Sequence, residues 1–200
     1  MGGGGDDTVA DRRDHRQHPE GRAGDRVAHW FVEQANRHDD LAVTVVDLTG
    51  YDFPATYPAE PTASIRAFVR EVGRADGFVV VTPEYNHSFP ASLKQAIDYA
   101  YDEWQAKPVG FVSYGCRSTG LHAVDQLRTV FTALHAMTVR DVVGIDLLAG
   151  EPTHSARKSC AVTRASCSTS SAGGGWPCAT VGRPALRLLK HVHHEGKDHE

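Results

Sequence analysis

The residues best suited to chemistry lie in two short segments, each of which follows an apolar run. The first is Thr-Pro-Glu-Tyr-Asn-His-Ser-Phe-Pro at 82–90. Pro83 fixes the backbone, Tyr85 offers an aromatic surface, and Asn86 carries both a hydrogen-bond donor and an acceptor. A stiff loop of this kind suits a flat ligand whose polar edge is read by backbone N–H groups. The residues alone leave a second interpretation open, in which Tyr85 and Phe89 plug the top of the core and Asn86 caps a turn.

The second segment, Ser-Tyr-Gly-Cys-Arg-Ser-Thr-Gly-Leu at 113–121, is rich in small residues. Ser113, Gly115, Ser118 and Gly120 would let the main chain approach a ligand closely. One such loop is weak evidence, because a glycine here could also serve a plain turn from strand to helix. Two loops of complementary composition on neighbouring strands make a stronger case for a binding site.

The elements that must position these loops alternate between strand-like and helix-like periodicity from about residue 25 to 150. The strand-like runs are almost continuously apolar, as expected for a parallel sheet covered on both faces. The pattern therefore predicts an α/β, doubly wound fold with its ligand beyond the carboxyl ends of the strands. The predicted strands are 41–48, 78–82, 107–115 and 139–148, and the predicted helices lie near 27–35, 65–72, 91–104 and 124–134.

At this point the sequence resembles the NADPH-dependent FMN reductases, a family of flavodoxin-like fold that includes quinone and azo-dye reductases. The resemblance rests on the segments 82–99, 107–115 and 120–128, and it covers most of residues 22–150. It implies FMN and NADPH as cofactors and a homodimer or homotetramer. It also implies a set of cofactor-binding residues: Pro83, Glu84, Tyr85, Asn86, Ser113, Tyr114, Gly115, Cys116, Gly120 and, near the phosphate, Arg22. Cys116 stands where the family often has a second glycine, so its role is open.

The activity implied by the resemblance is hydride transfer from NADPH through FMN to a quinone, an azo dye, another flavin or a similar acceptor. The protein needs no catalytic acid or base for this chemistry, so we expect Glu84 to contact a loop or a second subunit and His87 to face solvent. Two alternatives are a non-catalytic flavodoxin-like electron carrier and a damaged, inactive product. The aromatic residues Tyr99, Tyr101 and Trp104 are expected either to face a partner subunit or, for Trp104, to close the helix against its own core.

The two ends of the chain depart from the family pattern. Residues 1–21 contain no strand-like run, although the family opens with a strand and a phosphate-binding loop, and 151–200 read as an irregular tail. We therefore predict a flavodoxin-like domain at 22–150 whose first strand and phosphate loop are missing or out of frame. Shifted reading of the codons for 11–20 permits Ile-x-x-Ile-Ile-Gly-Ser-Thr-Arg, and shifted reading of 166–179 permits a closing helix. Without that central strand the sheet would have a gap, and FMN would bind weakly or not at all.

Composition excludes several other functions. The net charge is −4 with scattered basic residues, which does not favour nucleic acid or an anionic membrane. There is no apolar run long enough to span a bilayer and no apolar leader segment, so we expect a cytoplasmic protein. The four cysteines lack zinc-ribbon spacing, and the histidines at 191, 193 and 194 are a weak chelating cluster, so no metal site is predicted.

Overall fold

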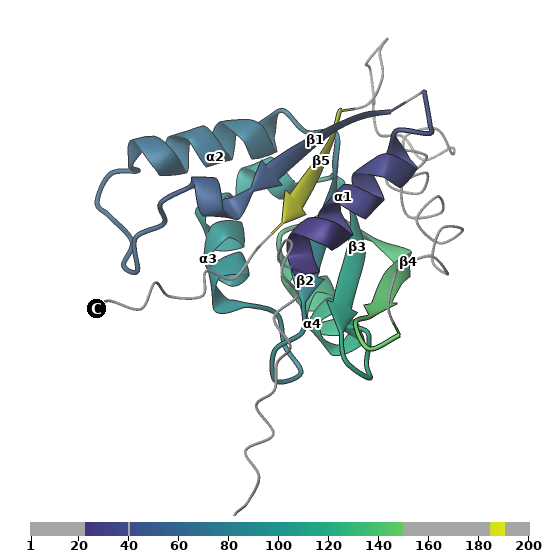
Figure 1. The fold of residues 1–200 in the computed structure, drawn as a ribbon. Coiled ribbons are helices and arrows are strands. Elements are labelled where there is room, and N and C mark those ends of the chain that lie inside the picture. Colours follow the sequence, from purple (N-terminus) through teal and green to yellow (C-terminus); the bar gives the residue numbers. More distant parts are fainter. Residues whose placement is uncertain (1–22, 40, 150–184, 191–200) are drawn as a thin grey trace, which may run out of the picture.

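The computed structural model describes residues 23–39, 41–149 and 185–190, and within them the chain forms a single parallel sheet with helices on both faces (Figure 1). The sheet has 5 strands in the order β1-β5-β2-β3-β4. This confirms the predicted α/β class and the four predicted strands and helices between 23 and 149. The strands are β1 Ala42–Asp47, β2 Gly77–Pro83, β3 Pro108–Gly115, β4 Met137–Asp146 and β5 Ala185–Lys190, and the helices are α1 Ala23–Ala35, α2 Ala63–Gly73, α3 Ala91–Tyr99 and α4 Leu121–Ala133, with short 3₁₀ turns η1 Leu48–Gly50 and η2 Asp102–Trp104.

The two faces of the sheet bury separate cores because successive strand residues point to opposite sides. One core joins α1 to alternate residues of the strands, such as Val79 and Val81 of β2. The other joins α2, α3 and α4 to the remaining positions, such as Val80 of β2 and Phe111 of β3. Figure 1 shows α1 on the near side of the sheet, with the other three helices behind it. Among the described residues, no helix is both long enough and apolar enough to cross a membrane.

Strand β5 corrects two expectations about the ends of the chain. It lies between β1 and β2, parallel to both, with Leu188 opposite Val45 on one side and Val79 on the other. The predicted gap is therefore filled, and part of the predicted irregular tail is the central strand (yellow in Figure 1). The physical reason is that the neighbours' backbone N–H and C=O groups need partners, whatever the position of the pairing strand in the chain.

The side chains of β5 alternate as a strand covered on both faces requires. Leu186 and Leu188 join the core under α1, whereas Leu189 joins the core under α2, α3 and α4. All three are at most 1% exposed. Leucine-rich segments such as this one favour helices in isolation, so burial between two strands overrides local propensity here. Residues 11–20 and 166–179, on which the reading-frame hypothesis depends, lie outside the described residues.

Trp104 resolves one of the open alternatives. Its side chain is fully buried, and its indole Nε1 donates a hydrogen bond of 3.0 Å to the carbonyl oxygen of Ile97. Its ring packs against Phe78 and Phe131. Trp104 therefore closes the end of α3 against the protein's own core and does not face a partner subunit.

Candidate functional site

The two loops singled out by the sequence lie side by side at the carboxyl edge of the sheet. Strand β2 ends at Pro83, which is paired in register with Tyr114 near the end of β3. The backbone N–H of Glu84 then donates to the carbonyl oxygen of Tyr114 at 3.1 Å, which continues the contact beyond the strand. The predicted neighbourhood of the two loops is thus confirmed, at the edge where parallel α/β sheets bind ligands.

Residues 85–88 form a tight turn at the tip of the first loop. Tyr85 and Ser88 exchange backbone hydrogen bonds of 2.8 and 2.9 Å, and the two residues between them have φ values of 50° and 62°. A type I′ turn requires this left-handed backbone at both central positions. Asn86 and His87 occupy them, and both residue types tolerate the left-handed region better than most. The turn explains why the loop is stiff without any help from a ligand.

Glu84 fastens the first loop to the second. Its Oε1 accepts a hydrogen bond of 2.8 Å from the Ser118 hydroxyl, and its Oε2 accepts one of 3.1 Å from the backbone N–H of His122. His122 lies in the first turn of α4, where a carboxylate is favoured by the unpaired N–H groups and the helix dipole. The expectation that Glu84 contacts a loop is confirmed.

Gln126 provides a second set of hydrogen bonds, which joins α4 to the first loop, and sequence reasoning missed this residue. Its Nε2 donates to the carbonyl oxygen of His87 at 2.7 Å, and its Oε1 lies 2.6 Å from the Ser88 hydroxyl, which donates to it. Gln126 follows His122 by one turn of α4, so both residues face the same loop. The only available signal was this four-residue spacing, which is common on any helix.

In the second loop the small residues pack against their own strand. Ser113 is fully buried, and its hydroxyl donates to the carbonyl oxygen of Thr119 at 2.8 Å. Gly120 has φ +84°, and a Cβ placed there would lie 2.6 Å from the Cβ of Ser113. A Cβ on Gly144 of β4 would lie 2.5 Å from Oγ1 of Thr119. The glycine at 120 is therefore required by the turn from strand to helix, which was the plainer of the two interpretations of this loop.

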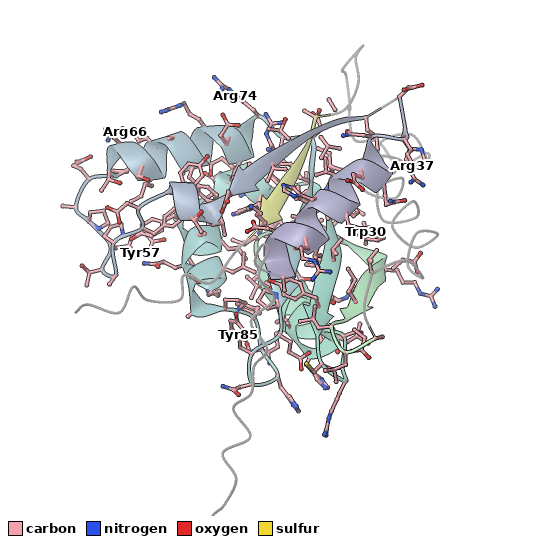
Figure 2. The ribbon with its side chains drawn as sticks, in the orientation of Figure 1. Trp30, Arg37, Tyr57, Arg66, Arg74 and Tyr85 are labelled. Carbon is pink, nitrogen blue, oxygen red and sulfur yellow. The ribbon has the colours of Figure 1, made fainter. Side chains whose placement is uncertain are left out.

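The exposed side chains at this edge come from both loops. Tyr85 is 44% exposed, and Asn86 and Cys116 are exposed, whereas Tyr114 is buried and burial raises the pKa of its hydroxyl. Figure 2 shows Tyr85 at the end of the molecule that carries the loop after β2. Arg22, predicted to lie near a phosphate, is outside the described residues. Binding of a cofactor by the ten predicted residues stays a prediction.

The carboxyl end of the central strand carries a cation that is already paired. The Lys190 ammonium forms ion pairs with Asp25, in the first turn of α1, and with Asp47 at 3.0 Å, at the end of β1. Burial opposes the charge of Lys190, but the two carboxylates outweigh it and raise its pKa. Burial likewise opposes the charge of Asp47, but hydrogen bonds from Lys190 and Thr49 lower its pKa. One cation and two anions leave this end of the sheet with a negative balance.

The sequence matches the family model described as NADPH-dependent FMN reductase over residues 17–149, well over half of the 200 residues. The chain belongs to this family. The match spans β1 to β4 and includes both loops at the carboxyl edge, whereas β5 lies beyond it. The resemblance inferred from the sequence is thereby confirmed.

Curated relatives of this FMN reductase family member are similar over part of their length. An NAD(P)H-dependent FMN reductase of Schizosaccharomyces pombe is 38% identical over 105 residues, which are 47% of this chain and 52% of that protein. An NAD(P)H-dependent FMN reductase of Saccharomyces cerevisiae is 42% identical over 80 residues, 40% of each chain. A quinone reductase of Escherichia coli is 39% identical over 68 residues, 34% of this chain and 36% of that one. The chain thus spans about half or less of the curated relatives it matches.

Solved structures confirm the flavodoxin-like fold of the family member. An oxidoreductase from Corynebacterium diphtheriae superposes with a TM-score of 0.59 at 18% identity, over 72% of this chain and 84% of that one. An NADH:FMN oxidoreductase in its apo form superposes with a TM-score of 0.57 at 18% identity, over 80% and 85% of the two chains. At this identity the likeness establishes the fold alone.

Proposed function

We propose that the protein is an NAD(P)H-dependent FMN oxidoreductase that passes a hydride from NADPH through FMN to a quinone, an azo dye, another flavin or a similar acceptor. The observation that carries the proposal is that the family match includes both carboxyl-edge loops, which the fold brings side by side. The names of the relatives, FMN reductase and quinone reductase, support the same class of reaction.

The residues at this edge fit the ring end of FMN. Tyr85 presents a half-exposed aromatic ring, and the tip at 86 and 87 presents polar groups on a turn that is rigid before any ligand arrives. When bound, FMN supplies the hydride chemistry at its ring. The protein's part is to orient the ring and to stabilise added negative charge with fixed donors, which cost no reorganisation during the reaction. Glu84 takes part indirectly, because both of its oxygens hold the two loops together.

The described residues offer a poorer fit to the phosphate end of FMN than to its ring end. In the family pattern the phosphate loop follows the central strand, and in this chain the strand in that place ends at Lys190. The charge of Lys190 is already shared by Asp25 and Asp47. A phosphate dianion placed there would meet two carboxylates for one ammonium, so we propose that FMN is held mainly by its ring.

The direct test is to purify the protein, add FMN, and measure retained flavin by absorbance after gel filtration. Anaerobic addition of NADPH, and separately of NADH, should bleach the bound flavin, and a quinone should restore the colour. Flavin that is retained but not bleached by either nucleotide would indicate an electron carrier. No retained flavin at concentrations well above those of the protein would refute the proposed function.

We propose further that the protein acts in the cytoplasm as a homodimer or homotetramer. The exposed side chains of Tyr57, Tyr85 and Tyr101 support an assembled state, since they are 70%, 44% and 59% exposed. Tyr57 and Tyr85 come from loops after β1 and β2 (Figure 2). Light scattering on the purified protein at several concentrations tests the assembly, and a strictly monomeric mass would contradict it.

A further inference from the structure

Three potential metal ligands converge between the first loop and α4. The carboxylate of Glu84 and the imidazoles of His87 and His122 have ligand atoms that all lie within 4.8 Å of one another. The two imidazole rings stack, with centroids 4.4 Å apart and planes inclined by 17°. The three residues lie directly after β2, at the tip of a turn and in the first turn of a helix, so no sequence spacing could reveal the cluster.

Hydrogen bonds hold the Glu84 carboxylate and the backbone at His87 in place. Glu84 accepts hydrogen bonds from Ser118 and from the backbone of His122, and Gln126 holds the carbonyl oxygen of His87. Metal sites in proteins depend on such supporting contacts, which orient the ligands before the ion arrives. Each carboxylate oxygen has two acceptor positions, so the hydrogen bonds on Glu84 leave it able to bind an ion.

We propose that Glu84, His87 and His122 form a binding site for a divalent first-row transition metal ion, and that zinc is the ion it fits. Two imidazoles and one carboxylate are a ligand set that zinc uses in proteins, with water in the fourth position of a tetrahedron. Zinc bonds of this kind place ligand atoms about 3.3 Å apart. A nitrogen lone pair lies in the plane of its imidazole ring, so the stacked rings must turn out of their stack before both can bind one ion. Both histidines are exposed, which leaves their rings room to make this rotation.

A metal ion bound at this site would join the first loop to α4 more firmly than the hydrogen bonds do alone. Glu84 directly precedes Tyr85, and His87 is one of the two central residues of the turn that begins at Tyr85. The ion needs no redox change and no flavin for this effect. The proposal therefore stands independently of the proposed function, and binding can be measured without any activity.

The experiment uses the full chain, stripped with a chelator and titrated with zinc in competition with a chromophoric chelator. The histidines at 191, 193 and 194 are first replaced by alanine, which removes the competing cluster noted in the sequence. In this background, His87→Asn and His122→Ala test the ligands, because asparagine tolerates the left-handed backbone at 87 and alanine suits a helix. The matched control is His29→Ala, an exposed histidine on α1.

The full-length background with these three histidines replaced should bind a single zinc ion. His87→Asn and His122→Ala should each weaken binding by roughly tenfold or more, with a smaller loss for Gln126→Ala. His29→Ala should leave the affinity unchanged. Cobalt should give the intense visible bands of a tetrahedral site, and these should disappear in both ligand variants. If the background with the three histidines replaced binds no zinc, or if both ligand variants bind zinc as tightly as that background, the proposal is overturned. Circular dichroism melts of each variant show whether a loss reflects unfolding.

Discussion

Replacing Leu188 by alanine tests whether the segment 185–190 truly forms the centre of the sheet. Leu188 is fully buried, in a strand paired on both edges. The substitution removes three carbon groups, worth about 0.8 kcal/mol each on transfer, or about 2.4 kcal/mol together. The cavity left behind in a close-packed core raises the expected loss of unfolding free energy to about 3–4 kcal/mol.

The assay is urea denaturation followed by circular dichroism and tryptophan fluorescence. The expected loss is a large part of the total of about 5–15 kcal/mol that holds a domain folded, so the midpoint should fall clearly. Leu148→Ala is the matched control, because Leu148 is 73% exposed and its loss should cost less than about 0.5 kcal/mol. Should Leu188→Ala prevent folding, Leu188→Val provides a milder step, expected at about 1 kcal/mol.

The refuting result is specific. If 185–190 were an unpacked tail, Leu188→Ala and Leu148→Ala would have the same small effect on the midpoint. A difference below about 0.5 kcal/mol between them would therefore show that the centre of the sheet is not built from this segment.

Three further predictions follow from the site. Gly120→Ala should destabilise the protein by about 1–3 kcal/mol and weaken flavin retention, because φ is +84° and the new Cβ would lie 2.6 Å from a β3 side chain. Gly50→Ala is the control, because the space around Gly50 is open, and it should have neither effect. Urea midpoints measure the stability of both variants. Lys190→Met should cost about 1 kcal/mol at neutral pH, since Asp47 is 38% exposed and solvent screens the pair. This difference from wild type should shrink as pH falls through the lowered folded pKa of Asp47, and again as pH rises through the raised folded pKa of Lys190; melts across pH that show a constant difference would contradict the pairing. The dissociation constant of riboflavin, which lacks the phosphate, should lie within about threefold of that of FMN when measured by fluorescence quenching, because the charge of Lys190 is already neutralised by Asp25 and Asp47. A preference for FMN of a hundredfold or more would contradict this account.

The alternation of apolar runs determined much of the fold before any coordinates. The almost continuous apolar segments 78–82 and 107–115 predicted buried parallel strands, and the helix-spaced stripes predicted helices on both faces. The place of the site followed as well, because loops after parallel strands share one edge of a sheet. These features depend on local periodicity, which is readable from short windows of sequence.

The contacts within the site required the tertiary structure. Glu84 lies 34 positions from its partner Ser118, and Gln126 lies 39 positions from its partner His87. Nothing in the local sequence marks either pair as partners. The role of Gly120 was open for a similar reason. The sequence is the same whether the missing side chain makes room for a ligand or for the neighbouring strand. Only the structure shows that a Cβ on Gly120 would lie 2.6 Å from Ser113.

The sequence by itself determined that this chain builds an apolar parallel sheet of the FMN reductase family with a rigid loop after β2. Only the tertiary structure decided that the central strand comes from the segment 185–190. The run Ala-Leu-Arg-Leu-Leu-Lys consists of good helix formers, so its local preference does not predict the strand that it forms. Its conformation is set by the unpaired backbone groups of β1 and β2, which lie more than 100 residues away along the chain, and by the two apolar cores on either side.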